Sequence, residues 1–139
     1  LTEEFIKDVH KRMFGEVWKW AGQFRKTDKT LGIDKHQISI EVRQLLDNTR
    51  YWIENKTFAD DEIAIRFKHR IVQIHCFSNG NGRHSRLLAD ILTTQVFHHD
   101  HFTWGQNLPK QNHVRKNYLT ALRLADANNF DLLISFARS

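Results

Sequence analysis

The chain of 139 residues has one cysteine, one proline and no long apolar run. The lone Cys76 cannot form an intrachain disulfide, which argues against a small secreted scaffold and fits a reducing, cytoplasmic compartment. No stretch approaches the roughly 18 apolar residues of a membrane-spanning helix, and no basic start precedes an apolar segment as in a signal peptide. With one proline and six glycines, the composition also excludes a low-complexity linker. We therefore expect a cytoplasmic protein with no membrane partner.

What the chain does contain is an ample core and an excess of positive charge. Apolar residues make up 40% of it and aromatic residues 12%, which suits one domain over residues 1–139. The chain begins with Leu1 rather than methionine, which is consistent with a fragment that lacks an N-terminal segment. Lys and Arg number 21 against 16 Asp and Glu, a net charge of +5. This balance favours an anionic partner, either nucleic acid, a nucleotide or an acidic surface.

Apolar residues recur at helical spacing through most of the chain. The spacing predicts a helix that begins at a Thr2 cap and passes residue 13, and further helices over about 41–55, 60–75, 83–96, 110–126 and 129–137. The helix over 60–75 is apolar on several faces, which is typical of a central, buried helix. The fold class predicted is all-α.

Residues 25–40 break this helical period. Asp28 and Gly32 favour turns, and Ile38-Ser39-Ile40 alternates apolar and polar. A small β-hairpin or extended flap is one interpretation, and a solvated loop between helices is the other; the sequence alone favours neither. The candidate flap residues are Thr27, Asp28, Lys29, Thr30, Leu31, Gly32 and Ile33.

The segment from His75 to Arg86 carries the strongest chemical signal. Its core, Ser-Asn-Gly-Asn-Gly at residues 78–82, suits backbone with positive φ, in which successive N–H groups can form a nest for an anion. The nest leads into a helix N-terminus, which also favours anions. Arg83 and Arg86 share one face of the first turn there, and His75 precedes the nest as a possible general base. A plain helix–turn–helix junction is the alternative, but this combination favours a polyphosphate site.

This segment resembles the signature of the Fic (filamentation induced by cAMP) family, His-x-Phe-x-Asp/Glu-Gly-Asn-Gly-Arg-x-x-Arg. The residues that match it in kind and spacing are His75, Phe77, Gly80, Asn81, Gly82, Arg83 and Arg86. The stretch Ala21-Gly22-x-Phe24-Arg25 and residues 26–40 resemble the part of that family that leads into its target-binding flap. Within the family, the chain resembles the group called mobile mystery protein B, which makes us expect a bacterial protein.

The resemblance implies a Fic-type helical bundle with a small β-hairpin flap, and transfer of AMP from ATP to a Ser, Thr or Tyr hydroxyl of a target protein. By position, His75 would deprotonate the hydroxyl and Phe77 would anchor the loop. Arg83 would hold the β-phosphate and Arg86 the γ-phosphate. The flap would hold the target as an added strand. The α- and β-phosphates would be surrounded by Gly80, Asn81 and Gly82.

Two features depart from the family pattern. Asn79 stands where the family has an Asp or Glu that holds Mg²⁺. An amide oxygen can ligate the ion but brings no charge, so we expect weaker metal binding, a slower reaction or a different substrate. The inhibitory pattern Ser/Thr-x-x-x-Glu-Gly/Asn has no match in this chain. We therefore expect inhibition from a segment upstream of Leu1, from an inhibitory partner or antitoxin, or by another means.

Three functional hypotheses follow. The first is a protein adenylyltransferase that uses ATP and Mg²⁺. The second is a Fic fold that binds nucleotide with little or no transfer, because Asn79 limits metal use. The third is a basic helical module that binds nucleic acid, in which the glycines only form a turn; we do not expect a nucleic-acid partner.

Overall fold

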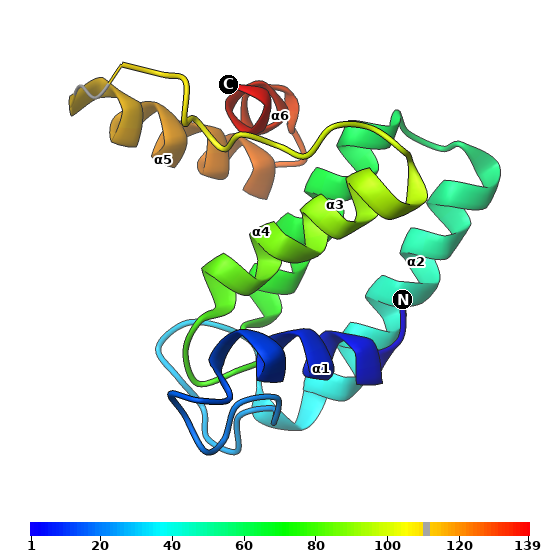
Figure 1. The fold of residues 1–139 in the computed structure, drawn as a ribbon, viewed down its shortest axis with the longest axis vertical. Helices are drawn as coiled ribbons and strands as arrows, with labels where there is room; N and C mark the ends of the chain where they lie inside the picture. The colour runs from blue at the N-terminus through cyan, green and yellow to red at the C-terminus, as the bar shows by residue number, and fades with distance from the viewer. Residues whose placement is uncertain (110–111) are drawn as a thin grey trace.

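The computed structural model describes residues 1–109 and 112–139. Helices α1 (Glu3–Phe14), α2 (Ile38–Asn55), α3 (Asp60–Ile74) and α4 (Asn81–Ile91) form the larger part, and α5 (Asn112–Asp126) and α6 (Asp131–Arg138) lie at one end of it (Figure 1). No strand occurs in the ranges that the structure describes, so the prediction of an all-α fold is confirmed. The predicted start of the fifth helix, residues 110 and 111, lies outside the described residues.

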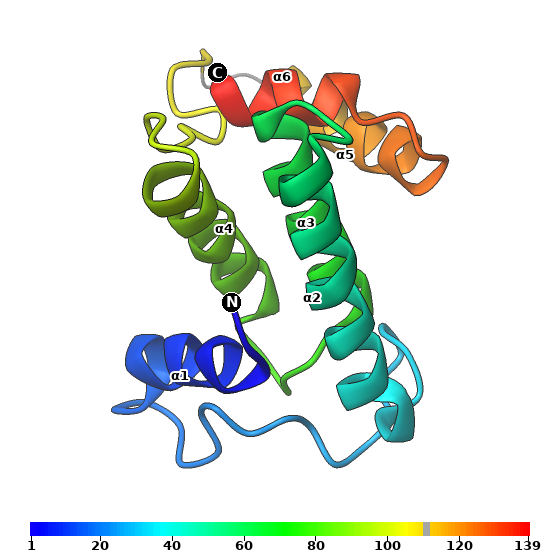
Figure 2. The same cartoon turned by 90° about the vertical axis from the view of Figure 1, so that its right-hand side faces the viewer.

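Helix α3 forms the centre of the bundle, as its apolar pattern predicts. It packs against α2, α4 and α6, and its buried residues point in several directions around its axis. Helix α1 lies across the end of the bundle at which α3 connects to α4 (Figure 1, Figure 2). Thr2 caps α1 by accepting a hydrogen bond from the Phe5 N–H at 3.0 Å, as predicted. Helix α1 and part of the segment that follows it therefore contact the α3–α4 connection.

Residues 15–34, between α1 and the short 3₁₀-helix η1 (Lys35–Gln37), form turns and bends. The prediction of a β-hairpin flap is wrong, since the described part of the chain holds no such ladder there. The physical reason is the guanidinium of Arg25, which donates to the carbonyls of Thr27 and Ile33 and so takes acceptors that a hairpin ladder would use. Gly32 has a φ of +99°, which is also not a strand conformation. Helix α2 follows directly and starts at Ile38, three residues earlier than predicted.

The helix predicted over 83–96 is two elements. Helix α4 starts at Asn81 and ends at Ile91, and a π-helical segment, η2 (Leu92–Val96), continues it, with the Phe97 N–H donating to the Leu92 carbonyl at 3.1 Å. The connection beyond η2 packs on α6, because the Ala137 carbonyl accepts from the N–H groups of Thr103 and Trp104, both at 2.9 Å. No helix within the described ranges is long and apolar enough to span a membrane.

Candidate active site

The predicted site lies where α3 passes into α4. Helix α3 ends because His75 adopts a left-handed conformation with a φ of +57°, and Gly80, with a φ of +78°, starts α4. A β-carbon on Gly80 would lie 2.6 Å from the Phe14 ring, so both its φ and its contact with α1 require glycine. Phe77 is fully buried between these two turns. The loop is thus held by its own backbone geometry and by α1.

His10 of α1 contacts the loop between α3 and α4, residues 75–80, and holds it in place, a role that sequence reasoning did not predict. Its ring is fully buried and stacks on Phe77 with ring centroids 3.7 Å apart. The Gly22 N–H donates to Nδ1 at 3.0 Å, so the Nε2–H is the donor to the Asn79 carbonyl, also at 3.0 Å. Burial lowers the pKa of His10, against the opposing effect of the Asn79 carbonyl. A neutral imidazole therefore joins α1 to the loop.

The side chain of Asn81 faces the loop and not a ligand. Its Oδ1 accepts from the Phe77 N–H at 3.0 Å and its Nδ2 donates to the Phe77 carbonyl at 2.8 Å. Asn81 can therefore offer a phosphate only its backbone N–H. Gly82 is exposed, and a β-carbon there would meet nothing within 4 Å, so the surface beside it is open.

The N-terminus of α4 is suited to an anion. The N–H groups of Asn81, Gly82 and Arg83 have no acceptor within the helix, since the first turn of any helix lacks them. No acidic side chain occurs in this turn and no side chain caps it, whereas the Asn79 Oδ1 accepts from the preceding Gly80 N–H at 2.8 Å. Free N–H groups and the helix dipole both attract negative charge. The structure thus places residues 80–83 at a helix N-terminus with free N–H groups, and the binding of a nucleotide there stays a prediction.

The two arginines of the motif have different surroundings. Arg83 is exposed and its guanidinium lies 4.8 Å from the centre of the Phe14 ring. Arg86 is half-buried and lies against Trp104 and Tyr118, with ring centres 5.6 and 5.7 Å away. In residues 1–109 and 112–139 neither arginine forms an ion pair with a carboxylate. Both charges therefore remain available to an anion.

Arg25 connects the candidate flap to His75, a role that sequence reasoning did not predict. Its side chain is fully buried, and its Nε donates to the His75 carbonyl at 2.6 Å. The same guanidinium donates to Ile33 and, at 2.9 Å, to Thr27. Gly32 lies so close that a β-carbon on it would be 2.7 Å from the His75 Cβ. One buried cation thus fixes the flap against the end of α3.

His75 is half-buried between these groups. Burial lowers its pKa, and the positive charges of Arg25 and Lys29 lower it further. At neutral pH the imidazole is therefore predominantly neutral, the form in which a histidine accepts a proton. By contrast, the neighbouring Cys76 thiol is buried, which raises its pKa to about 12 and excludes it as a nucleophile.

Asn79 is exposed at the mouth of the loop, and its amide oxygen is already the acceptor for the Gly80 N–H. The described residues contain no group of three or more His, Cys, Asp or Glu side chains arranged around a point. Because Mg²⁺ prefers carboxylate oxygens, these residues do not fit a protein-held magnesium site.

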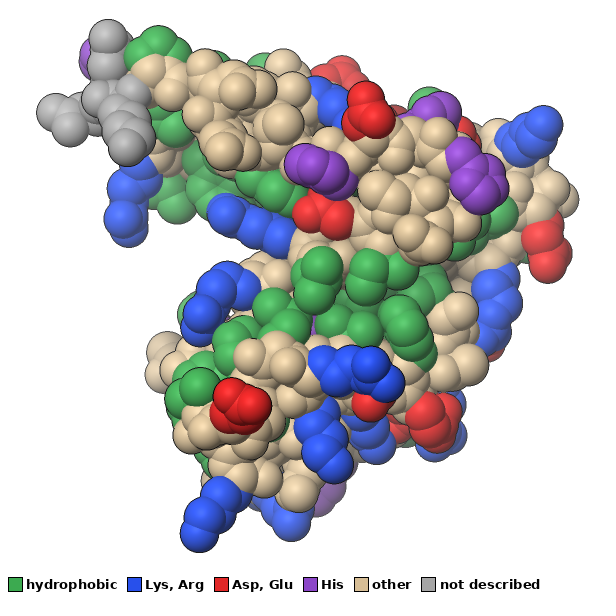
Figure 3. Space-filling model, viewed as in Figure 1, with side chains coloured by type: hydrophobic (Ala, Val, Ile, Leu, Met, Phe, Trp, Pro, Cys, Tyr) green, Lys and Arg blue, Asp and Glu red, His purple; other side chains and the backbone are tan. Residues whose placement is uncertain are grey.

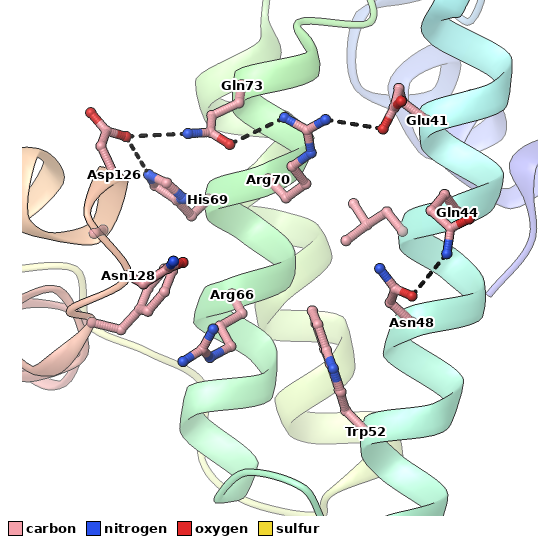
Figure 4. A pocket seen from close by; sticks show the side chains of 13 residues that line it. Glu41, Gln44, Asn48, Trp52, Arg66, His69, Arg70, Gln73, Asp126 and Asn128 are labelled. Carbon is pink, nitrogen blue, oxygen red and sulfur yellow. Dashed lines mark hydrogen bonds and ion pairs between the residues drawn. The ribbon is translucent and has the colours of Figure 1, made fainter.

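A second polar pocket lies between α2, α3 and the end of α5, with a volume of about 260 Å³ (Figure 4). His69 is paired with Asp126 at 2.8 Å, and Gln73 donates to the same carboxylate oxygen. Arg70 donates to Glu41 at 3.0 Å. Since these groups satisfy one another, the pocket is better explained as a network that joins the helices than as a binding site.

Comparison with known proteins agrees with this geometry. The family model of the Fic/DOC family matches residues 1–93. The chain belongs to the Fic/DOC family. It is 30% identical over 96 residues to a protein adenylyltransferase Fic of Aedes aegypti. The aligned residues cover 66% of this chain and 19% of that protein. A protein of the same name from Drosophila grimshawi is 26% identical over 140 residues, 98% of this chain and 28% of the relative.

Solved structures show the same fold. Fic-1 from C. elegans (residues 134–508) superposes with a TM-score of 0.77 and 19% identity, over 99% of this chain and 40% of that one. The BepC protein of Bartonella tribocorum, solved with bound AMPPNP, has a TM-score of 0.71 and 19% identity, over 98% and 72% of the two chains. The Fic-type helical fold is thus confirmed, while the chain spans less than a third of the length of the insect relatives it matches.

Proposed function

We propose that this Fic domain transfers AMP from ATP to a Ser, Thr or Tyr hydroxyl of a target protein. The observation that carries the proposal is the placement of a neutral, half-buried His75 beside an α4 N-terminus with free N–H groups. The names of the two insect relatives, protein adenylyltransferase Fic, support the same reaction.

In the proposed reaction the target hydroxyl gives its proton to His75 and its oxygen bonds to the α-phosphorus of ATP. The bond from that phosphorus to the oxygen bridging the α- and β-phosphates breaks, and pyrophosphate leaves. Backbone N–H groups of Asn81 and Gly82, with Arg83, would stabilise the phosphate charge, and Arg86 would hold the γ-phosphate. When bound, Mg²⁺ would neutralise phosphate charge, and the group that this motif position offers it is the Asn79 amide oxygen.

The flap, residues 27–33, would hold the target beside His75. The backbone groups of residues 29–31 form no hydrogen bond within the described part of the chain, and the Leu31 side chain is 68% exposed. Backbone groups that are free of internal hydrogen bonds can pair with the main chain of a partner. We propose that the flap becomes a strand only when the target supplies the second one.

An inhibitory partner or antitoxin would act by placing a carboxylate against Arg86. We assign the reaction to the cytoplasm because the lone cysteine is a free, buried thiol.

The test is labelled ATP incubated with the protein and a lysate of candidate targets. Label from the α-phosphate should appear on protein and label from the γ-phosphate should not, and His75→Ala should abolish the transfer. His99→Ala is the matched control, because His99 is exposed and pairs with Asp60 at 2.8 Å, away from the motif. Transfer of γ-label, or α-transfer that survives His75→Ala, would refute the proposal. Nucleotide binding without transfer would support the second hypothesis, and salt-sensitive DNA binding without ATP binding the third.

A further inference from the structure

Two basic side chains from different helices meet beside α5. Lys68 of α3 is only 2% exposed, and Arg86 of α4 is half-buried. Both lie against the same two rings: the Lys68 Nζ is 6.0 Å from the centre of Trp104 and 5.9 Å from that of Tyr118. The corresponding distances from the Arg86 guanidinium are 5.6 and 5.7 Å. We call Lys68, Arg86, Trp104 and Tyr118 the basic cluster.

In residues 1–109 and 112–139, neither Lys68 nor Arg86 has a carboxylate within ion-pair distance. The Lys68 Nζ donates a hydrogen bond to the Tyr118 hydroxyl oxygen at 3.3 Å. Asp90, one turn after Arg86 on α4, is already the acceptor for the Phe102 N–H at 3.0 Å and the Trp104 Nε1 at 3.2 Å. A buried cation without an anion is costly, so the arrangement calls for a negatively charged ligand.

Two further observations agree. The surface is hollowed between α5 and the elements beneath it, with Lys or Arg side chains on both sides of the hollow (Figure 3). Burial lowers the pKa of Lys68 and the charge of Arg86 lowers it further, against the opposing effect of Tyr118. The negative charge of a bound phosphate would oppose both effects, because it favours the charged form of Lys68.

We propose that Lys68 and the Tyr118 hydroxyl, with Arg86, form a subsite for the terminal phosphate of a nucleoside triphosphate. The inference rests on the proposed function in that Arg86 belongs to the nucleotide motif. Lys68 makes the protein select triphosphates over monophosphates, because a monophosphate held at the α4 N-terminus does not extend to this cluster.

The experiment measures dissociation constants of ATP, AMP and inorganic tripolyphosphate by calorimetry. Lys68→Met keeps the bulk of the side chain and removes its charge. This substitution should raise the dissociation constants of ATP and tripolyphosphate about tenfold or more and change that of AMP less than about twofold. Tyr118→Phe should raise the dissociation constants of ATP and tripolyphosphate by about two- to tenfold. Lys116→Met, which removes an exposed charge from α5, is the matched control and should leave all three unchanged.

If Lys68 only stabilised the fold, the variants would behave differently. Removal of an uncompensated buried charge should leave the melting temperature of Lys68→Met unchanged or higher, whereas loss of a structural contact would lower it. Unchanged tripolyphosphate binding by folded Lys68→Met or Tyr118→Phe, or equal weakening of ATP and AMP, would overturn the inference. These outcomes are separate from the proposed function: tripolyphosphate binding that depends on Lys68 supports the subsite even where no AMP transfer is seen.

Discussion

Acid should destabilise this protein through His84, a residue inside the motif helix α4. Its side chain is 1% exposed and lies roughly perpendicular to the stacked rings of Phe77 and His10, with ring centroids 5.1 and 5.5 Å away. Its Nε2 is 2.9 Å from the Ile6 carbonyl of α1, to which it donates. Burial is the main cause that lowers the pKa of His84 to about 4, and nearby His10 adds to it.

The sign follows from proton linkage. The unfolded chain has an ordinary histidine, with a pKa of 6.5, so between pH 6.5 and about 4 it binds more protons than the folded chain. The free energy of unfolding is therefore at its full value above pH 6.5 and falls as the pH drops toward 4. At about 1.4 kcal/mol per pKa unit, the loss from His84 alone is about 3 kcal/mol.

Urea unfolding at pH 7.5 and pH 4.5 measures this loss. His84→Gln keeps a donor for the Ile6 carbonyl but cannot gain a proton, so its deficit in stability relative to the wild type should shrink by about 2 kcal/mol at the lower pH. His36→Gln, at an exposed histidine, is the matched control, and its free energy of unfolding should differ from that of the wild type by the same amount at both pH values. Contributions of other groups cancel between variants. A deficit that is the same at both pH values would refute the reasoning.

The remaining predictions concern the loop and the flap. Arg25→Lys should lower the free energy of unfolding in urea by about 2–4 kcal/mol, because a lysine cannot donate to all the backbone carbonyls that the guanidinium binds. The variant should also expose the flap to protease and transfer less AMP, with its affinity for ATP intact. An unchanged cleavage pattern would contradict this. Gly80→Ala should lower the melting temperature at a cost of about 1–3 kcal/mol, through its positive φ and the Phe14 ring, whereas Gly82→Ala should not; equal effects would argue against a strained loop. Asn79→Asp should lower the Mg²⁺ concentration needed for half-maximal transfer, and no shift with ATP binding intact would show that Asn79 does not limit metal use.

The parts of the molecule that sequence reasoning predicted are those that local patterns determine. Helix α3 follows from apolar residues on several faces, and the loop before α4 follows from glycines and asparagines that tolerate positive φ. The motif residues His75 to Arg86 come together because they are neighbours in the chain. Helix ends were less accurate: α2 begins at Ile38 and not at residue 41, because η1 leads directly into it.

What sequence reasoning missed depends on contacts between distant segments. Arg25 is 50 residues from His75 yet holds its carbonyl, and His10 is 69 residues from Asn79. In the sequence, Arg25 belongs to a polar stretch typical of a solvated loop, and nothing local marks it as buried. The buried Arg25 also explains why the predicted β-hairpin is wrong. Its guanidinium already donates to the Thr27 and Ile33 carbonyls, so these acceptors are not available for hydrogen bonds between two strands. A flap held open in this way keeps residues 29–31 unpaired, which is the condition for pairing with a target chain.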